Sequence, residues 1–476
     1  MIERSRGLWK VIVRMRFCAL VGVAGLLGAC APAVRHFPPE AKLAALLQER
    51  VRDRRAVGIA VGVLEADGTT TTAFAGDAGA GAGAPGGRTG FEIGSITKTF
   101  TGVLLADMVR TGEVRFDDPV SRYLPHGVRV PSRNGREITL LDLATNHSGL
   151  PGMPDNLSPA DHTNPYADYS VEQMYGFVSG HRLRSDPGTS YEYSNIGFGL
   201  LGHALERAAN SPYEDLVRAR ILAPLGMDGT AIELRGGQRD RMARGHNNRG
   251  FVVPYWDLPT IAGAGAFRSS MDDLLRYLAA NVRAPKSGLD RSIHVTHQPQ
   301  HAVSDSAAAR TGTNAMGMGW QIRTVGNRRI VWKDGGTAGF QTFIGFDPER
   351  RVGVVVLSNT AIEVDDVGFH LIEPSLPLGA PPPIPRPVDV PASVLERYVG
   401  EYAVDPDISI VVSREGGTLF FEAFGEERAP LFAESENRFF PEAFDARITF
   451  IRGAAGAVDD IVLRAGGREM PGRRVR

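Results

Sequence analysis

The chain of 476 residues contains only two cysteines, Cys18 and Cys30, and both lie near its N-terminus. A folded domain that begins after them has no disulfide and no thiol chemistry. Acidic and basic residues nearly balance, which gives a formal net charge of −1 at pH 7. Because the basic surplus that binds nucleic acid is missing, we expect no nucleic-acid partner.

The N-terminal hydrophobic run is too short to cross a bilayer. It extends from Phe17 to Leu27 and follows a segment that carries the basic residues Arg4, Arg6, Lys10, Arg14 and Arg16. A basic segment followed by a short apolar run is the pattern of a signal peptide.

The end of this run, Leu27-Gly28-Ala29-Cys30, resembles the lipobox of bacterial lipoproteins. The resemblance implies cleavage before Cys30, lipidation of the Cys30 sulfur and a lipid anchor in the cell envelope. Ala31 does not resemble the acidic signal for inner-membrane retention, so we expect the periplasmic face of the outer membrane. The alternatives are a plain secretory signal cut after a nearby alanine and an N-terminal helix that is retained.

Lysine is scarce as well, because only five of the 53 basic residues are lysine: Lys10, Lys42, Lys98, Lys286 and Lys333. Arginine cannot be deprotonated in proteins, whereas lysine can serve as a base where burial or a nearby cation holds it neutral. In Ser95-Ile96-Thr97-Lys98, the apolar pattern that follows predicts a helix on which Ser95 and Lys98 share a face. This spacing predicts a nucleophile beside its base. The alternative is a helix-capping Ser95 with a solvated Lys98.

A second polar cluster, Tyr193-Ser194-Asn195, lies where a loop enters an apolar helical run. A phenol near a lysine ammonium can become a phenolate and carry protons, and an asparagine can orient a substrate amide. We therefore expect Tyr193 and Asn195 to lean into one cleft. The alternative is an ordinary turn with a half-buried tyrosine.

A third cluster, Lys333-Asp334-Gly335-Gly336, continues a strand pattern. Its glycines allow a substrate backbone to approach closely, and Lys333 is suited to hold a substrate carboxylate or to keep Tyr193 ionised. The alternative is a hairpin with a surface lysine.

Taken in this order, Ser95-x-x-Lys98, Tyr193-x-Asn195 and Lys333-x-Gly335 resemble the three motifs of the penicillin-recognising serine hydrolases. The likeness is greatest to the class C β-lactamases and to related penicillin-binding proteins and family VIII carboxylesterases. It implies an α+β fold with a five-stranded antiparallel sheet flanked by helices and the site at the sheet edge.

The resemblance also implies the role of each site residue. Ser95 is the expected nucleophile, and Lys98 and Tyr193 are the expected proton-transfer pair. The oxyanion hole comes from the N–H groups of Ser95 and Gly336. The expected substrate contacts are Asn195, Lys333, Asp334 and Gly335.

Asp334 departs from the family pattern, which usually has a small hydroxyl residue at this position. A carboxylate there repels the carboxylate of a β-lactam, unless it pairs with a cation or turns away. We expect hydrolysis of an amide or ester, in a β-lactam or a D-amino-acid peptide, through a Ser95 acyl-enzyme. The alternatives are a carboxylesterase with poor β-lactam turnover and a penicillin-binding sensor that acylates without turnover.

The remaining sequence predicts two domains and no cofactor or metal site. His294, His297 and His301 have no acidic or sulfur partner at ligand spacing. Short strands with glycine turns predict a small C-terminal β barrel or sandwich that looks like a lipocalin-like module. The expected division is a signal peptide (1–29), a tether (30–39), the hydrolase domain (40–375), a proline-rich linker (376–391) and the β domain (392–476). The sequence leaves the oligomeric state open.

Overall fold

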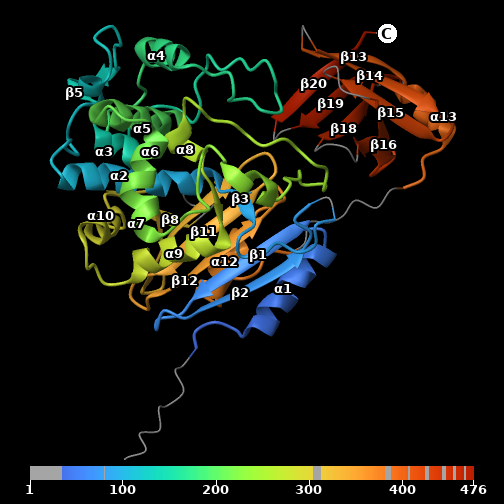
Figure 1. Cartoon of the computed structure of the whole chain (residues 1–476). Coiled ribbons are helices and arrows are strands. Elements are labelled where there is room, and N and C mark those ends of the chain that lie inside the picture. Colours follow the sequence, from blue (N-terminus) through green and yellow to red (C-terminus); the bar gives the residue numbers. More distant parts are fainter. Residues whose placement is uncertain are drawn as a thin grey trace, which may run out of the picture. The chain divides into compact units, whose positions relative to one another are not determined.

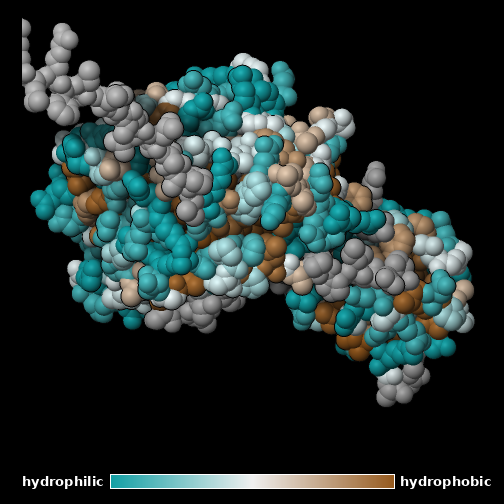
Figure 2. All heavy atoms as spheres, turned by 90° about the horizontal axis from the view of Figure 1, so that it is seen from below, coloured by the Kyte–Doolittle hydropathy of each residue, from teal (hydrophilic) through white to brown (hydrophobic). Residues whose placement is uncertain are grey.

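The structure, a computed structural model, describes residues 35–79, 81–303, 312–380, 388–405, 408–423, 428–441, 446–453, 457–465 and 468–475 (Figure 1). The predicted signal peptide, Cys30 and most of the predicted tether lie outside these residues. Within the described ranges, no helix combines the length and apolar character that crossing a membrane requires. Figure 2 shows hydrophilic and hydrophobic residues interspersed over one face of the molecule.

The centre of the hydrolase region is an antiparallel sheet, which in the described ranges has eight strands in the order β2-β1-β12-β11-β10-β9-β8-β7. Each neighbouring pair runs antiparallel. The strands are β1 (Gly58–Leu64), β2 (Thr70–Gly76), β7 (His301–Ala302), β8 (Thr313–Met316), β9 (Gln321–Val325), β10 (Arg328–Gly336), β11 (Gln341–Asp347) and β12 (Val352–Ser358).

The α+β class and the antiparallel sheet flanked by helices are confirmed, whereas the expected number of five strands is wrong. Strand β2 extends the sheet on one side, and β8 and β7 extend it on the other. Strands β7 and β8 span two and four residues, too few for an alternating pattern to show in the sequence.

Both faces of the sheet are covered, so its central strands are apolar throughout. Every residue of β1 and β12 is buried. Along β1, Val61 and Val63 join the core formed with α1 (Glu40–Arg52) and α12 (Asp365–Ile372). Ala60 and Leu64 face the larger core on the opposite side of the sheet. This alternation is the period of two that strands impose.

The helix that carries the first motif lies in the middle of the larger core. Helix α2 (Thr97–Arg110) is buried from Thr97 through Met108 and follows a short 3-10 turn, η1 (Gly94–Ile96). A helix that is buried on every side must be surrounded by other elements. Its neighbours include α3 (Leu140–Ala144), α5 (Asn195–Ala209), α6 (Tyr213–Val217), α8 (Ala262–Gly265) and α10 (Gly288–Thr296).

The other helical elements of this region include three α-helices, a π-helical turn and two 3-10 turns: α4 (Val171–Gly180), α7 (Ala223–Leu225), α9 (Met271–Val282), η2 (Val120–Tyr123), η3 (Arg218–Leu222) and η4 (Gly236–Arg241). Two small two-stranded sheets pair β3 (Gly90–Glu92) with β6 (Arg268–Ser270) and β4 (Ser132–Arg133) with β5 (Arg136–Glu137).

The C-terminal region is a closed antiparallel barrel, which resolves the predicted choice between a barrel and a sandwich. Its eight strands, counted over the described residues, are β13 (Gly400–Asp405), β14 (Ile408–Glu415), β15 (Thr418–Ala423), β16 (Ala429–Ala433), β17 (Arg438–Pro441), β18 (Ala446–Arg452), β19 (Val458–Ala465) and β20 (Arg468–Arg474). Helix α13 (Ala392–Leu395) and the 3-10 turn η5 (Glu396–Tyr398) precede them. Tyr398, Tyr402 and Phe450 pack in the barrel core, and closure leaves no free strand edge.

Candidate active site

The first motif lies on a tight turn that brings it to the end of strand β10. Ser95 is half-buried in η1, one turn before Lys98 on α2. Gly94 has a left-handed φ of +47°, and a Cβ there would lie 2.8 Å from the backbone N and O of Gly336. Only glycine therefore allows η1 to approach β10 so closely.

The Ser95 hydroxyl contacts both members of the predicted proton-transfer pair. Its Oγ accepts hydrogen bonds from Lys98 Nζ at 2.9 Å and from Tyr193 Oη at 2.6 Å. The structure thus brings together three side chains from η1, α2 and the loop before α5.

Lys98 is fully buried and has three oxygen partners. Besides Ser95, its Nζ donates to Asn195 Oδ1 and to the Ala264 carbonyl, each at 2.7 Å. Burial lowers the pKa of Lys98, and the ammonium of Lys333 lowers it further. The site therefore favours the neutral amine more than water does.

Tyr193 lies between the two buried lysines. Its ring centroid is 4.8 Å from Lys98 Nζ and 5.4 Å from Lys333 Nζ. Burial by itself raises the pKa of Tyr193, but the ammonium groups of Lys333 and Lys98 outweigh that effect and bring the pKa below its usual value. The surroundings thus favour a phenolate.

Asn195 has a different set of contacts from the one the sequence suggested. It is the first residue of α5, which Ser194 caps by accepting a hydrogen bond from the N–H of Gly197. The Asn195 Oδ1 is taken by Lys98, and its Nδ2 contacts Met153 Sδ at 3.6 Å. Asn195 therefore holds Lys98 in place in addition to lining the cleft around Ser95.

Lys333 and Asp334 form an ion pair at the end of β10. Lys333 is 1% exposed, whereas the Asp334 side chain is 38% exposed and also accepts a hydrogen bond from Gln321 Nε2 at 2.9 Å. Burial by itself lowers the pKa of Lys333, but Asp334 raises it above the usual value. The predicted repulsion by Asp334 is thus tempered, because the carboxylate has a cation and an amide as partners.

The end of β10 is accessible because its neighbour stops early. Strand β9 pairs with β10 only from Arg328 to Trp332, so Lys333 to Gly336 extend past β9 and lie against η1. The site therefore lies beside an interior strand, and not at an outer edge of the sheet as expected, because β8 and β7 continue the sheet beyond β9. A Cβ at Gly335 would meet the Ile93 carbonyl at 2.0 Å, which explains this glycine.

Ser95 and Gly336 line one narrow cleft of about 40 Å³. Its far wall contains Tyr166 and Trp256, whose rings meet edge to face at 5.1 Å. Sequence reasoning missed both aromatic residues and the Ala264 carbonyl. The loop of small residues around Ala264 was the only signal in the sequence. It could not identify the carbonyl that binds Lys98, because every residue type has a backbone oxygen.

A buried carboxyl group lies behind this wall. Glu92 accepts a hydrogen bond from the backbone N–H of Trp256 at 2.9 Å and lies 3.4 Å from the guanidinium of Arg268. Burial raises the pKa of Glu92 to about 7, and Arg268 offsets only part of that effect. Glu92 therefore holds the backbone of Trp256 in the cleft wall, and its pKa lies near neutrality.

The histidines considered above as metal ligands, and His147, have structural contacts. His147 Nδ1 bonds with the Thr145 carbonyl at 2.7 Å, and its ring stacks on His301. His297 Nε2 contacts Asn281 Oδ1 at 2.5 Å, and His294 Nε2 contacts the Arg283 carbonyl at 2.7 Å. Among the described residues, no group of three or more His, Cys, Asp or Glu side chains is placed to hold a metal ion.

Comparison with known proteins places most of the chain in one family. Residues 43–372 match the family described as Beta-lactamase, and residues 385–474 match a domain of unknown function, DUF3471. D-alanyl-D-alanine-carboxypeptidase/endopeptidase AmpH of Escherichia coli (strain K12) is 30% identical over 273 residues, which cover 56% of this chain and 70% of AmpH.

Two further relatives extend the match. Penicillin-binding protein 4* of Bacillus subtilis (strain 168) is 26% identical over 413 residues, covering 80% of this chain and 86% of that protein. The crystal structure of a beta-lactamase/D-alanine carboxypeptidase from Yersinia pestis superposes with a TM-score of 0.59 at 25% identity, covering 68% of this chain and 94% of that one.

Proposed function

The chain belongs to the beta-lactamase family, and we propose that it is a serine hydrolase of the cell envelope that cleaves an amide or ester through an acyl-enzyme on Ser95. The observation that carries the proposal is the pair of contacts at Ser95 Oγ, 2.9 Å from Lys98 Nζ and 2.6 Å from Tyr193 Oη. A hydroxyl nucleophile needs a neighbour to take its proton, and two titratable groups are within reach.

The contacts of Lys98 allow it to act as a base without rearrangement. The carbonyls of Asn195 and Ala264 each take one N–H, and the remaining position on Nζ faces Ser95. A neutral Lys98 keeps both carbonyl contacts and turns its lone pair toward the Ser95 hydroxyl. Its lowered pKa makes that state accessible.

The reaction then divides into acylation and deacylation. Ser95 Oγ forms a bond to the acyl carbon while its proton passes to the Tyr193 phenolate, directly or by way of Lys98, and Tyr193 delivers that proton to the leaving nitrogen or oxygen as the original bond breaks. Water repeats the attack on the acyl-enzyme, and its proton returns through the same pair. Ser95 is released with its hydroxyl restored.

The backbone N–H groups of Ser95 and Gly336 form the proposed oxyanion hole. Two observations support this assignment: η1 approaches the end of β10 closely, and both residues line the same cleft. Backbone donors fixed at this junction stabilise the negative charge that develops on the carbonyl oxygen. Gly335 permits the approach, and Lys333 and Asp334 contact the part of the substrate that lies along β10.

The substrate is a D-amino-acid peptide or a β-lactam, the classes that the names of the relatives indicate. A specific observation supports a second candidate, a carboxylesterase with poor β-lactam turnover. Lys333 is already paired with Asp334, so less of its positive charge is available for a substrate carboxylate. Neutral esters do not depend on that charge.

The proposed location rests on the sequence before the described residues. Residues 1–29 act as a lipoprotein signal peptide, and Cys30 carries the lipid that attaches the protein to the outer membrane through the 30–39 tether. Metabolic labelling with a palmitate analogue should tag the wild type and leave Cys30→Ser unlabelled. Equal labelling of the two forms would remove the lipid anchor from the proposal.

The division into a hydrolase domain (40–375), a linker (376–391) and a β domain (392–476) is part of the same proposal. The family match at residues 43–372 falls within the first of these segments.

Intact-mass spectrometry tests the mechanism directly. The protein is mixed with a penicillin and, separately, with an activated ester, and the mass is followed over time. We expect a covalent adduct that forms and decays in the wild type and that Ser95→Ala lacks. A persistent penicillin adduct would identify a sensor without turnover, and an adduct in Ser95→Ala would refute the nucleophile assignment.

A further inference from the structure

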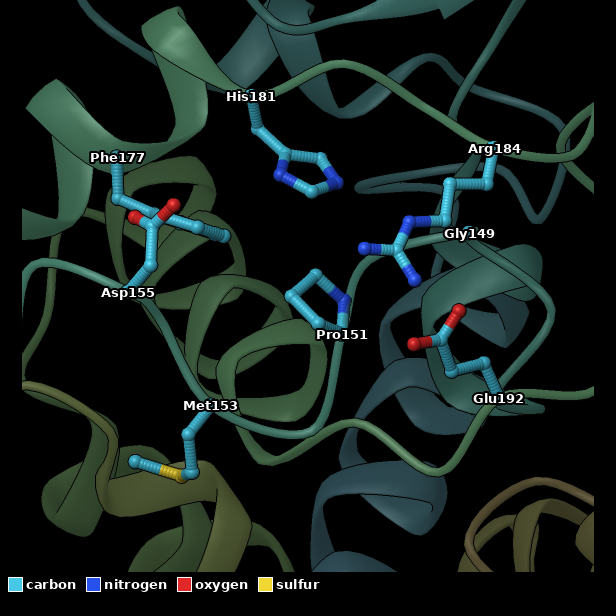
Figure 3. A pocket seen from close by; sticks show the side chains of 8 residues that line it. All are labelled: Gly149, Pro151, Met153, Asp155, Phe177, His181, Arg184 and Glu192. Carbon is cyan, nitrogen blue, oxygen red and sulfur yellow. The ribbon is translucent and has the colours of Figure 1, made fainter.

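A second cavity is lined by residues of the segments 149–155 and 177–192, and the second segment leads directly to Tyr193 and Asn195 (Figure 3). It has a volume of about 180 Å³, and Pro151, Met153 and Phe177 supply its apolar lining. Met153 also contacts the Asn195 amide on the catalytic side, at 3.6 Å. The cavity and the Ser95 cleft are therefore separate spaces that touch the same short segment.

Charged and polar side chains of both signs enter this cavity. Figure 3 shows the Arg184 guanidinium and the Glu192 carboxylate on one side, Asp155 beside Phe177 on the opposite side, and the His181 ring between them. Within the part of the chain that the structure describes, no hydrogen bond or ion pair joins the Asp155, His181, Arg184 or Glu192 side chain to another protein group. Asp155 and Arg184 are exposed, and His181 packs on Phe177 with its ring centroid at 5.1 Å, so the polar atoms of all four side chains are open to a ligand.

The charge pattern and the volume together define the ligand. A simple anion would meet two carboxylates, and a simple cation would offset the net negative charge of the lining but leave the Arg184 guanidinium without an anionic partner. A zwitterion satisfies both signs at once. At roughly 30 Å³ per water, the cavity holds the equivalent of about six waters, and it is smaller than the roughly 300 Å³ at which sites for drug-sized ligands begin.

We propose that this cavity binds a zwitterionic amino acid, either free or as the distal residue of a peptide to which it is joined through its side chain, with its carboxylate on Arg184 and its ammonium between Asp155 and Glu192. The planar guanidinium accepts a carboxylate in a two-pronged contact, and the His181 ring adds a polar edge. The apolar lining by Pro151, Met153 and Phe177 takes a small side chain.

The ligand has two possible sources, and both share this chemistry. One is a free amino acid or dipeptide that binds beside the catalytic loop. The other is the far end of a peptide whose scissile bond lies at Ser95, a reading that rests on the proposed function. Only two side-chain contacts separate the cavity from the base beside the nucleophile: Met153 contacts Asn195, and Asn195 accepts a hydrogen bond from Lys98.

Calorimetry on the full chain tests the binding site without requiring turnover. The probes are D-alanine, N-acetyl-D-alanine and D-alanine amide, which carry both charges, only the carboxylate and only the ammonium. We expect D-alanine to bind at least tenfold more tightly than either blocked form. Arg184→Gln and Asp155→Asn should each weaken D-alanine binding by tenfold or more.

The neighbouring Arg182 gives a matched control, because it is exposed and does not line the cavity. Arg182→Gln should bind D-alanine like the wild type. Equal affinity for the three probes, equal effects of Arg182→Gln and Arg184→Gln, or no binding of D-alanine at millimolar concentration would each overturn the proposal.

Kinetics distinguish the two sources. Two peptide substrates share one scissile end and differ only in whether the distal amino acid is free or blocked. If the cavity holds the distal end, Arg184→Gln lowers kcat/KM by tenfold or more for the free peptide only; if it holds a separate ligand, both peptides respond alike. Failure of the wild-type enzyme to form a Ser95 adduct with either a penicillin or an activated ester would refute the proposed function, and the calorimetry would still decide the cavity.

Discussion

Lys98 and Lys333 both place a buried ammonium group beside the ring of Tyr193, yet their pKa values move in opposite directions. Lys98 donates its hydrogen bonds to uncharged oxygens, and burial outweighs the opposing effect of Tyr193, so its pKa falls. Lys333 has the carboxylate of Asp334, which outweighs burial and raises its pKa. The difference shows that the partner at each ammonium, and not depth alone, decides which lysine can lose its proton.

The comparison assigns the two lysines different tasks. Lys98 is suited to exchange a proton with Ser95, and Lys333 is suited to remain a fixed positive charge that stabilises a Tyr193 phenolate. A substitution by arginine separates these tasks, because arginine keeps the positive charge and cannot lose its proton.

Replacing Lys98 with arginine should have the largest effect. Arginine retains the positive charge and cannot act as a base, so Lys98→Arg should lower the acylation rate on the order of 10³-fold, within the range of general acid–base catalysis. The rate is measured by stopped-flow mixing with a chromogenic β-lactam or ester. Lys333→Arg is the control and should lose only about tenfold, because its task requires a charge alone. Equal losses in the two variants would contradict the comparison.

Removing the hydroxyl between the two lysines should have the next largest effect. Tyr193→Phe leaves both ammonium groups in place and deletes the 2.6 Å contact to Ser95, so we expect a loss of about 10²-fold in kcat. In the wild type, activity should fall on the acid side as the phenolate is protonated. A Tyr193→Phe variant that keeps this acid limb at full activity would place the titrating group elsewhere.

Asp334→Thr changes the partner of Lys333 and leaves the contacts of Lys98 as they are. It removes one negative charge, releases Lys333 and restores the hydroxyl that is usual in the family. A like charge near a substrate carboxylate costs on the order of 1–3 kcal/mol, so kcat/KM for a carboxylate-bearing β-lactam should rise about tenfold to hundredfold. A neutral p-nitrophenyl ester should change little. If both substrates respond equally, or neither does, Asp334 does not select against anionic substrates.

The local parts of this site could be predicted from sequence. Spacing placed Ser95 and Lys98 on one helical face, and in the structure Lys98 Nζ donates to Ser95 Oγ at 2.9 Å. Helix, strand and turn patterns act over a few residues, so they leave a readable period. The order of three motifs then indicated the family.

The parts that depend on long-range contacts could not be predicted. The Ala264 carbonyl reaches Lys98 across 166 positions, and a backbone oxygen has no residue signature. Gln321 orients Asp334 from the neighbouring strand, a contact that exists only once the register of β9 and β10 is set. The second cavity likewise collects Asp155 from one segment, and Arg184 and Glu192 from the loop between α4 and α5, and no spacing rule describes the meeting of these two segments.

Glu92 extends the comparison from the two lysines to a buried carboxyl group. Of the proposed substitutions, we expect Glu92→Gln to have the smallest effect on activity, and its main effect is on the pH dependence of stability. Burial raises its pKa from 4.5 to about 7, so the folded state holds the proton more tightly than the unfolded state. The stability that this proton contributes is complete below pH 4.5 and is lost as the pH rises to about 7. The loss should be about 1 kcal/mol per pH unit in that window, as the linkage relation gives.

Glu92→Gln tests this because the amide cannot titrate, while its oxygen still accepts the hydrogen bond from the backbone N–H of Trp256. Urea unfolding between pH 5 and pH 8 should show a flatter pH dependence in Glu92→Gln than in the wild type. Glu349→Gln, at an exposed glutamate, should keep the wild-type slope. If Glu92→Gln also keeps that slope, Arg268 holds Glu92 ionised throughout this pH range. Glu92 would then resemble Lys333, whose charged partner outweighs burial, and not Lys98, for which burial dominates.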